Sequence, residues 1–359
     1  GYVLRSITAS TGLMVAANQL LSPSASPSTQ PLFLSGVALE FLALAIDSLY
    51  KYLEHGHLIR LEKRDISVLE KVKKYIAIGE KAHEMLGRTP GSVIAVKPLK
   101  DGVIADFDKT EIMLDYFIKK IKGKTIFSKP RILICCPSNI TQVEKNAIKE
   151  VAERTGAKKV YVEEEPKVAA IGAGLSIDMP TGNMVIDIGG GTTDIAVLSL
   201  NGIVYSESIK LAGNTFDTDI IKYIKNKYKL LIGEVTAEQV KIKIGTVSTK
   251  EKEKKMEVRG RDLLTGLPKT ITVTSNEIKE AIKDSAEMIV HAAKLVLEKI
   301  EPELAADIID KGIVLTGGGA LLDGLDKLIE KEIKVPTKVA ESPLTCVAEG
   351  TGIILDNLI

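Results

Sequence analysis

The sequence contains no tryptophan, and aromatic residues of all kinds make up only 4% of its 359 residues. Proteins that bind single-stranded nucleic acid stack the bases on aromatic side chains, so this shortage argues against such a surface. The formal net charge is +1, which gives no sign of a nucleic-acid partner or a strongly acidic one. We therefore expect no nucleic acid among the partners of this protein.

Cysteine and histidine are also scarce, and neither forms a metal-binding pattern. Of the three cysteines, Cys135 and Cys136 are adjacent in an apolar run and Cys346 stands alone. No residue near His55 and His57 completes a metal site. Three cysteines without metal spacing are typical of a protein in a reducing compartment. We expect all three to serve as small buried hydrophobic residues.

The chain also has no long hydrophobic run that is free of charge. Its most apolar stretch, residues 32–50, contains Glu40 and Asp47. A charged residue near the centre of a bilayer costs about 2.5–3.5 kcal/mol on insertion scales. This stretch is therefore expected to be a buried or amphipathic helix. Residues 1–31 are rich in serine but lack the layout of a signal peptide, so we assign no export signal.

The chain has the composition of an ordinary folded protein, with 45% hydrophobic and 26% charged residues, and its length is sufficient for two domains. From about residue 65 onward the apolar spacing alternates between the periods of strands and helices. Strands are predicted at 93–96, 131–136, 160–162, 202–209 and 311–316, and helices at 109–121, 142–155, 166–174 and 276–300. This order predicts an α/β fold with a ligand in a cleft between two halves.

A more charged region, residues 214–276, interrupts the second half and is expected to be a smaller inserted subdomain. It includes an alternating run of lysine and glutamate at 250–255. Charge runs of this kind usually lie on solvated surfaces. We interpret this one as the tip of a hairpin.

The most informative motif lies at 184–197, where an apolar strand enters a glycine-rich turn and a second apolar strand follows. The turn consists of Gly189, Gly190, Gly191, Thr192 and Thr193. Consecutive glycines allow backbone N–H groups to surround an anion, and the threonine hydroxyls add donors. Asp187, just before the turn, is suited to hold a hydrated divalent cation against phosphates. The motif differs from Walker and Rossmann loops, and a plain hairpin needs fewer glycines, so we predict a phosphate-binding turn.

Three further segments are candidates for the same ligand. The first, a strand followed by a glycine turn, comprises Gly317, Gly318, Gly319 and Ala320, where close backbone approach and a helix dipole suit a phosphate or an adenosine. In the second, Glu238 and Lys241 share one helix face, either to touch a ribose and a purine or to form a surface ion pair. The third is an acidic cluster that ends in Glu165. Its acids either favour the helix dipole or orient a water toward a terminal phosphate.

These motifs resemble the MreB family of bacterial actins, within the actin, Hsp70 and sugar-kinase superfamily. The resemblance covers about residues 66–359, roughly four-fifths of the chain. It is carried by the segments 79–108, 163–174, 185–197, 231–245 and 312–326. The pair Cys135-Cys136 before Pro137, together with Lys167, resembles the Mbl (MreB-like) paralogue more than MreB itself.

The resemblance implies an actin-like ATPase fold, with two α/β domains around a nucleotide cleft. Domain I is expected to comprise residues 64–179 and 338–359. Domain II is expected to comprise residues 180–337, with the inserted subdomain at about 214–276. Residues 1–63 remain unassigned.

The resemblance also implies ATP and Mg²⁺ as cofactors and assigns roles to the motif residues. The glycine-rich turn 189–193 would hold the phosphates, and Asp187 would hold Mg²⁺ through water. The adenosine would be held by Glu238, Gln239, Val240, Lys241 and the turn 317–320. Glu165 would orient the attacking water, with Thr192 close by, because in-line attack on a phosphate depends mainly on a positioned water and neutralised charge.

Members of this family form paired, ATP-dependent filaments at the inner face of the cell membrane and control cell shape by organising cell-wall synthesis. The implied protein is cytoplasmic and peripheral to the membrane. The implied partners are other copies of the chain, the membrane surface and the wall-elongation machinery of the MreC, MreD and RodZ type. Ile126 and Phe127 occupy the place of the apolar loop that inserts into lipid in this family, near Lys122, Lys124 and Lys129. The alternative is a half-buried loop.

The sequence departs from the family over residues 1–63, which lack the first phosphate hairpin, Asp-Leu-Gly-Thr-Ala-Asn. Asp47 lies near the expected distance, but the bulkier Ser48, Leu49 and Tyr50 follow it. Three explanations stay open: a divergent paralogue, a misread or rearranged coding region, or an added segment that replaces the hairpin. With half of the clamp missing, hydrolysis is expected to be poor. The functional alternatives are a nucleotide-deficient structural paralogue that co-polymerises and a small-molecule kinase of the same superfamily.

Overall fold

The computed structural model describes residues 78–79, 82–83, 85–89, 95–100, 102–122, 129–248 and 253–358. The chain divides into two compact units, Gly1–Val96 and Lys97–Ile359, and nearly all of the described structure belongs to the second. The apolar stretch 32–50, both His55 and His57, and the expected membrane residues Ile126 and Phe127 lie outside the described residues.

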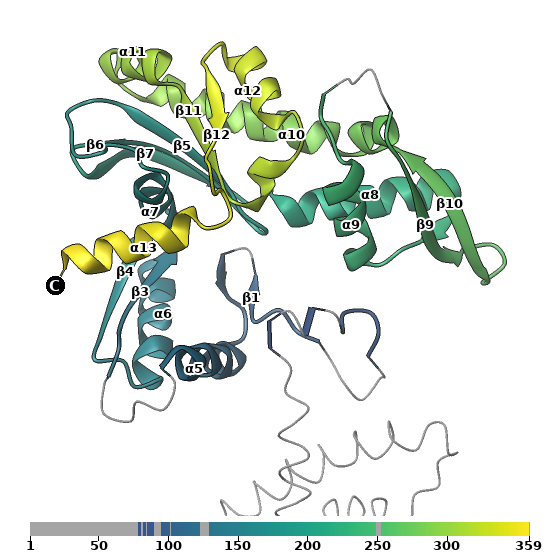
Figure 1. Ribbon diagram of the computed structural model, residues 1–359, viewed down its shortest axis with the longest axis horizontal. Helices are drawn as coiled ribbons and strands as arrows, with labels where there is room; N and C mark the ends of the chain where they lie inside the picture. The colour runs from purple at the N-terminus through teal and green to yellow at the C-terminus, as the bar shows by residue number, and fades with distance from the viewer. Residues whose placement is uncertain are drawn as a thin grey trace, which may run out of the picture. The chain divides into compact units, whose positions relative to one another are not determined.

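The second unit is built around a five-stranded sheet in the order β12-β11-β5-β6-β7 (Figure 1). Its strands are β5 (Asn183–Ile188), β6 (Thr193–Ser199), β7 (Gly202–Ile209), β11 (Ile313–Thr316) and β12 (Thr337–Val339). β11 runs parallel to both β5 and β12, whereas β6 is antiparallel to both β5 and β7. All six residues of β5 are buried, as expected for a strand that is covered on both faces.

Helices cover both faces of this sheet. Met184, Ile186 and Ile188 belong to the larger core, which includes buried residues of α10 (Ser275–Lys299), α11 (Pro302–Lys311) and α12 (Leu325–Ile333). Val185 instead packs with Ala169 and Ala170 of α7 (Glu165–Gly172). Since side chains alternate along a strand, Asp187 shares the α7 side with Val185. The sheet therefore places Asp187, from the predicted phosphate-binding motif, beside α7, the helix that begins at Glu165.

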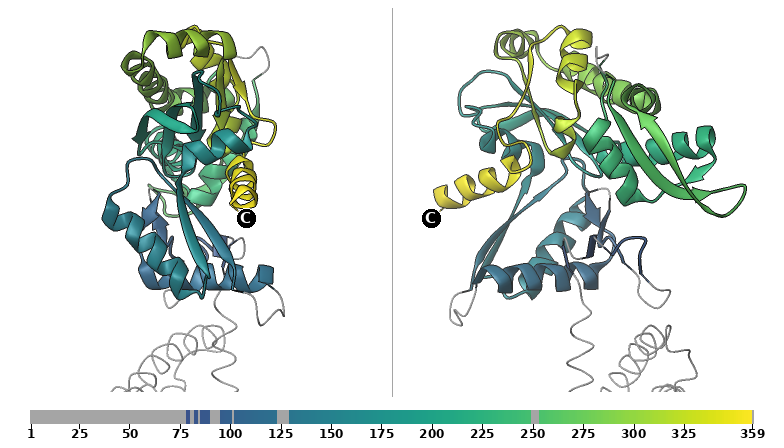
Figure 2. Two further views of the ribbon diagram at one scale, coloured as in Figure 1. Left: turned by 90° about the vertical axis from the view of Figure 1, so that its left-hand side faces the viewer. Right: turned by 45° about the vertical axis from the view of Figure 1, so that its right-hand side comes forward.

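A second α/β segment precedes this sheet in the chain and is joined to it by α7. It contains β1 (Leu99–Lys100), β2 (Val103–Ile104), α5 (Phe107–Lys122), β3 (Arg131–Cys136), α6 (Gln142–Arg154) and β4 (Lys159–Glu164), with β3 parallel to β4. α13 (Cys346–Asn357) packs across α7, as the two views of Figure 2 show. A Cβ on Gly172 would lie 1.8 Å from the Cys346 oxygen, and one on Gly350 would lie 2.0 Å from the Val168 oxygen. The small residues of α7 thus allow the close backbone approach that helix–helix contact requires here.

The region 214–276 forms a small layer of α8 (Gly213–Tyr228), β8 (Leu230–Leu231), α9 (Glu234–Ile244), β9 (Lys255–Asp262) and β10 (Pro268–Thr274), and its buried residues belong to the same core as the five-stranded sheet. Its three strands are antiparallel in the order β10-β9-β8. Residues 250–252 of the lysine and glutamate run expected at a hairpin tip lie outside the described residues. Its last residue, Lys255, begins β9, and the tip of the β9–β10 hairpin lies at 263–267. Gly266, with φ of +74°, and the hydrogen bonds from the Leu264 and Thr265 N–H groups to the Asp262 carboxylate shape this tip.

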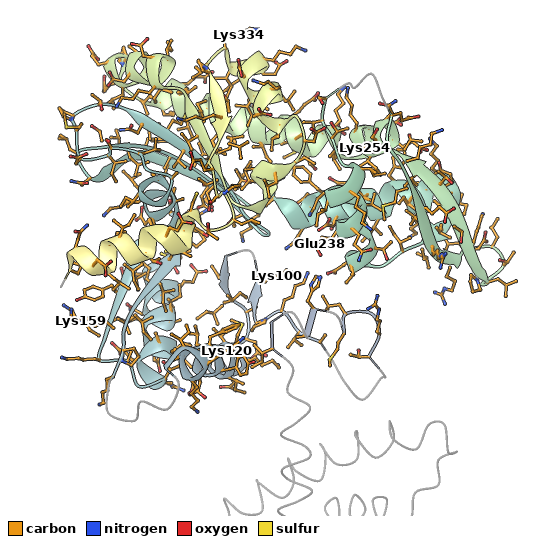
Figure 3. All side chains as sticks on the ribbon, viewed as in Figure 1. Lys100, Lys120, Lys159, Glu238, Lys254 and Lys334 are labelled. Carbon is orange, nitrogen blue, oxygen red and sulfur yellow. The ribbon has the colours of Figure 1, made fainter. Side chains whose placement is uncertain are left out.

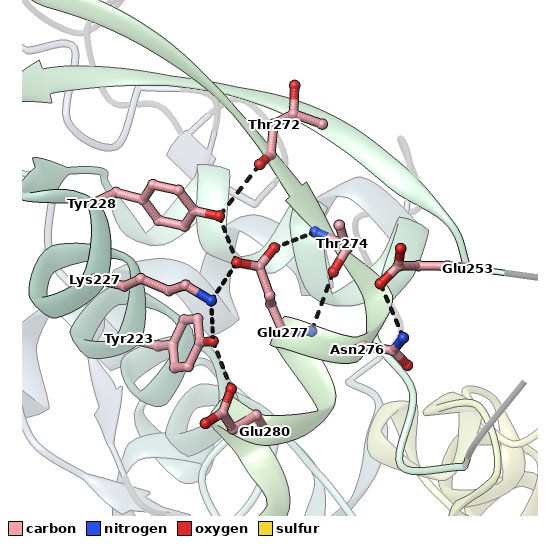
Figure 4. Close-up of polar contacts among 9 residues, drawn as sticks. All are labelled: Tyr223, Lys227, Tyr228, Glu253, Thr272, Thr274, Asn276, Glu277 and Glu280. Atoms are coloured by element: carbon pink, nitrogen blue, oxygen red, sulfur yellow. Dashed lines mark hydrogen bonds and ion pairs between the residues drawn. The ribbon is translucent and has the colours of Figure 1, made fainter.

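A polar network joins the end of α8 to the start of α10 (Figure 4). Thr274 and Glu277 form a capping box, in which the Glu277 carboxylate accepts from the Thr274 N–H at 2.8 Å. The same carboxylate also forms an ion pair with the Lys227 ammonium at 2.8 Å and accepts a hydrogen bond from the Tyr228 hydroxyl. Lys227 in turn donates to the Tyr223 hydroxyl at 3.0 Å. One glutamate thereby caps a helix and fixes a neighbouring one.

The elements expected from the sequence are largely confirmed. The strands at 131–136 and 202–209 have the expected bounds, and the helices at 109–121, 142–155, 166–174 and 276–300 differ by a few residues at their ends. The strand expected at 93–96 is not present at residues 95 and 96, the two that the structure describes. No helix in the described part of the chain is long and apolar enough to cross a membrane.

Candidate functional site

The glycine-rich turn closes a tight hairpin between β5 and β6. Ile188 pairs with Thr193 at the ends of the two strands, and the Gly189 N–H donates to the Thr192 carbonyl at 2.9 Å. The Thr193 hydroxyl is fully buried and donates to the Leu211 carbonyl at 2.6 Å, so it fixes the turn to the next loop. Because the Thr193 hydroxyl is already used in this bond, Thr193 contributes its backbone to the site rather than a free hydroxyl.

The first turn of α8 holds the peptide groups of the glycine turn. The Gly213 N–H donates to the Gly189 carbonyl at 3.1 Å, and the Asn214 N–H donates to the Gly190 carbonyl at 2.8 Å. In a trans peptide the carbonyl and the following N–H point in opposite directions. The N–H groups of Gly190 and Gly191 are therefore turned away from α8. This arrangement provides backbone donors for an anion on the far side of the turn.

Three carboxyl groups gather beside the turn. Asp187 is 3% exposed, and its carboxylate accepts from the buried Thr316 hydroxyl at 2.7 Å. Burial, opposed by this hydrogen bond and reinforced by the charge of Asp194, raises the pKa of Asp187 to about 6. Burial and the charges of Asp187 and Asp194 raise the pKa of Glu165 to about 8. The pKa of Asp194 is also raised, again mainly by burial. A nearby cation would stabilise the ionised forms of these three carboxyl groups.

The end of β3 closes the other side of this cluster. The Ser138 N–H donates to the Asp194 carboxylate at 3.3 Å. The Ser138 hydroxyl is buried and has no hydrogen-bond partner among the residues that the structure describes. Gly102, in the β1–β2 turn, packs against Pro137 and Thr192, since a Cβ there would lie 2.3 Å from the Pro137 ring and 3.5 Å from the Thr192 methyl. An unsatisfied hydroxyl at this position is consistent with a polar ligand.

The turn after β11 lies directly against the end of β5. Gly317 has φ of +80°, and a Cβ on it would lie 2.4 Å from the Ile188 carbonyl oxygen and 2.8 Å from the Asp187 carboxylate. A Cβ on Gly319 would lie 2.2 Å from the Ile188 side chain, and one on Gly318 would lie 3.2 Å from the Leu344 side chain. Ala320 is buried in the core, so only its backbone can face a ligand. The structure thus brings the turn 317–320 and the phosphate-type turn together.

Helix α9 carries the residues expected to hold the adenosine, and Figure 3 marks Glu238 on it. Burial raises the pKa of Asp217 on α8; the hydrogen bond from Lys241 opposes this increase, and the charge of nearby Glu238 adds to it. Gln239 is exposed, and Val240 is fully buried in the core, where its side chain is closed to a ligand. The Lys241 ammonium binds the Gly213 carbonyl at 2.8 Å and Asp217 at 2.9 Å. Lys241 is therefore directed toward the first turn of α8.

The cysteines meet the expectation in part. Cys136 and Cys346 are buried, whereas Cys135 is half-buried. Burial, the Glu165 charge and neighbouring acids raise the pKa of the Cys135 thiol to about 12. Cys135 therefore lines the site beside the acidic cluster as an uncharged thiol.

The acidic cluster fits a hydrated Mg²⁺ that is shared with a phosphate ligand. Mg²⁺ keeps several waters and is usually held by one or two carboxylates together with substrate phosphates. Asp187 offers one buried, hydrogen-bonded carboxylate at the mouth of the turn. The described residues contain no group of three or more His, Cys, Asp or Glu side chains that could hold a metal by itself. These residues therefore suit a cation whose remaining ligands are water and the phosphate oxygens of a bound nucleotide.

Sequence reasoning missed several residues that shape this site: Gly102, Ser138, Gly213, Asn214, Asp217 and Thr316. Thr316 ends a predicted strand directly before the glycine turn 317–320, so the sequence pattern could have indicated that it lies at the site. The sequence Ala-Gly-Asn at 212–214, between a strand and a helix, was a further signal. Asp217 had none, because its role depends on a lysine 24 residues away in the chain.

Solved structures define the class of this fold as actin-like. The chain superposes on the crystal structure of MreB5 of Spiroplasma citri bound to ADP with a TM-score of 0.76 and 43% identity, covering 79% of this chain and 85% of that one. The same protein bound to AMPPNP gives the same values. The MamK double helical filament shares the fold, with a TM-score of 0.69 and 21% identity over 81% of this chain and 89% of that one.

Sequence relatives identify the family. A family model described as MreB/Mbl protein matches residues 51–359, beginning earlier than the expected start near residue 66. The cell shape-determining protein Mbl of Bacillus cereus is 63% identical over 79% of this chain and 86% of its own length. The cell shape-determining protein MreB of Escherichia coli K12 is 51% identical over 79% of this chain and 82% of its own length. The chain belongs to the MreB/Mbl family, and the expected likeness to Mbl is confirmed.

Proposed function

We propose that this chain is a bacterial actin that binds ATP with Mg²⁺ and forms filaments that control cell shape. The observation that carries the proposal is the convergence on one site of the Gly189–Thr192 turn, the acids Asp187 and Glu165, and the Gly317 turn. These groups offer backbone donors, a cation-holding carboxylate and close backbone approach. The nucleotide-bound S. citri structures and the names of the cell-shape relatives support this reading.

In this proposal the N–H groups of Gly190 and Gly191 bind the phosphates, and Asp187 holds the hydrated cation. Mg²⁺ supplies charge neutralisation of the terminal phosphate when it is bound. Glu165 orients the attacking water beside Thr192. Its raised pKa means that the carboxyl group holds a proton near neutral pH until a positive charge is present. Positioning, rather than strong basicity, is what phosphoryl transfer to water requires.

The proposal extends to filaments at the inner face of the cell membrane that organise cell-wall synthesis. The MreB and Mbl names of the relatives, together with the actin-like fold shared with a filament-forming protein, support assembly. The apolar pair Ile126 and Phe127 supports a membrane contact, since two apolar residues beside lysines suit an anionic lipid surface. Other copies of the chain and the wall-elongation machinery remain the proposed partners.

Sedimentation with and without ATP, in the presence of anionic liposomes, tests this function. We expect ATP-dependent pelleting of the full chain and phosphate release that Glu165→Ala abolishes while ATP binding persists. Pelleting that is indifferent to nucleotide would favour a nucleotide-deficient paralogue that co-polymerises. Transfer of phosphate to a sugar without pelleting would instead favour a small-molecule kinase.

A further inference from the structure

We propose that Asp217 is a positioning residue for the phosphate-binding turn, acting through Lys241 and the first turn of α8. The inference rests on the proposed nucleotide function. It assigns Asp217 a role at a distance from the ligand and makes Lys241 the link between α9 and the glycine turn. Both residues lie in the small layer formed by the region 214–276.

The pair is enclosed rather than a surface contact. Asp217 is 7% exposed as a residue, and the side chains of Lys241 and Asp217 are 16% and 11% exposed. The Lys241 ammonium lies 2.9 Å from the carboxylate and donates to the Gly213 carbonyl at 2.8 Å. Charged hydrogen bonds of this kind are shorter and stronger than neutral ones. The ammonium therefore ties α9 to the residue at which α8 begins.

Gly213 passes this restraint directly to the glycine turn. Its N–H donates to the Gly189 carbonyl, and the next N–H, from Asn214, donates to the Gly190 carbonyl. There is little free space around it, because a Cβ on Gly213 would lie 3.3 Å from the Gly189 oxygen and 3.4 Å from the Lys241 ammonium nitrogen. The carbonyl of Gly213 is thus held by Lys241 while its N–H holds the turn.

This arrangement makes the orientation of the phosphate-binding N–H groups depend on Asp217. Without the carboxylate, the buried ammonium of Lys241 loses its counter-charge and moves toward water or another acid. The Gly213 carbonyl then loses its donor, and the two bonds to the glycine turn loosen. Because the N–H groups proposed to bind phosphate belong to the peptide groups of this turn, the affinity for phosphate falls. Adenosine uses none of these donors, and the Lys241 ammonium is directed to Asp217 and the Gly213 carbonyl rather than to an adenosine, so adenosine binding is affected far less.

Asp217→Asn in the full chain tests the inference with two readouts. First, amide hydrogen exchange in the protein without nucleotide should quicken about tenfold at Gly213 and Asn214. Second, affinity for ADP should fall about tenfold while affinity for adenosine stays within about twofold. Asp262→Asn is the matched control, because Asp262 is also buried and lies 2.8 Å from a lysine, Lys269, in the same layer. It should change neither readout.

The outcomes separate this inference from the proposed function. Unchanged exchange at Gly213 and Asn214, or an equal loss of ADP and adenosine binding, would overturn the role of Asp217. A wild-type chain that binds no ADP would contradict the proposed function, and the exchange measurement would still decide whether Asp217 fixes the turn. The double variant Asp217→Asn with Lys241→Met should exchange no faster than Lys241→Met alone, because the two residues act as one unit. Additive effects would count against the link.

Discussion

Glu165 is a half-buried acid whose pKa is raised to about 8 by desolvation and by the charges of Asp187 and Asp194. In the unfolded chain the pKa of a glutamate lies near its model value of 4.5. Between these two values the folded state binds more protons than the unfolded state, so stability falls as pH rises. The same direction holds for Asp187, whose pKa is raised to about 6.

Glu165→Gln should therefore flatten the pH dependence of stability in the protein without nucleotide. At pH 8 the variant should be more stable than the wild type by roughly 4 kcal/mol, and this advantage should disappear toward pH 4.5. Urea unfolding across this pH range measures it, with the exposed Glu287→Gln as control. Parallel wild-type and variant profiles would show that Glu165 ionises normally.

Gly317 makes a second prediction at the scale of one residue. Gly317→Ala should reduce the free energy of unfolding by about 1–3 kcal/mol, because the left-handed backbone and the nearby Ile188 oxygen leave no room for a methyl group. Gly352→Ala is the control, since nothing lies within 4 Å of its Cβ position and it sits inside α13. It should be neutral or slightly stabilising. Equal behaviour of the two variants in urea unfolding would argue against close packing of the Gly317 turn on β5.

At the scale of elements, the junction of α8 and α10 depends on Glu277. Glu277→Ala removes the cap at Thr274 and the partners of Lys227 and Tyr228, and it should lower the free energy of unfolding by about 2 kcal/mol. Glu287→Ala, in an exposed pair on the same helix, should change it by less than about 0.5 kcal/mol. Chemical unfolding compares them, and a loss no larger than that of Glu287→Ala would show that the network of Figure 4 is not a structural joint.

Elements with strong periodicity were predictable from the sequence, and so were the glycine turns. β3 has the expected bounds because its continuous apolar run ends before Pro137, and β7 because it starts at Gly202, directly after the turn residue Asn201. The hairpin tip at 263–267 was not predicted, because it depends on hydrogen bonds from the Leu264 and Thr265 N–H groups to the Asp262 side chain, which no charge or hydrophobic pattern reveals. The Asp217–Lys241 pair was also unpredictable. It forms only when α8 and α9 pack, which is tertiary information.

At the scale of the whole molecule, the proposed membrane contact depends on Ile126 and Phe127, which lie outside the described residues. Replacing both with serine should lower co-sedimentation with anionic liposomes several-fold while leaving assembly in solution unchanged, because the loss is one of apolar contact with lipid. Lys124→Ser is the control, since it removes a neighbouring charge and leaves both apolar residues in place. Its effect should be smaller and should vanish at high salt. Undiminished liposome pelleting of the double variant would contradict the membrane role of these residues.

The central claim is that the turn between β5 and β6, with its acids and the Gly317 turn, forms a nucleotide site. Titration of the full chain with Mg·ATP, followed calorimetrically, tests it most directly. The account predicts saturable binding that is weakened at least about tenfold by Asp187→Ala, since the loss of a buried charged partner is of that size. Absence of saturable binding up to millimolar ATP, in a chain that remains folded, would contradict the account.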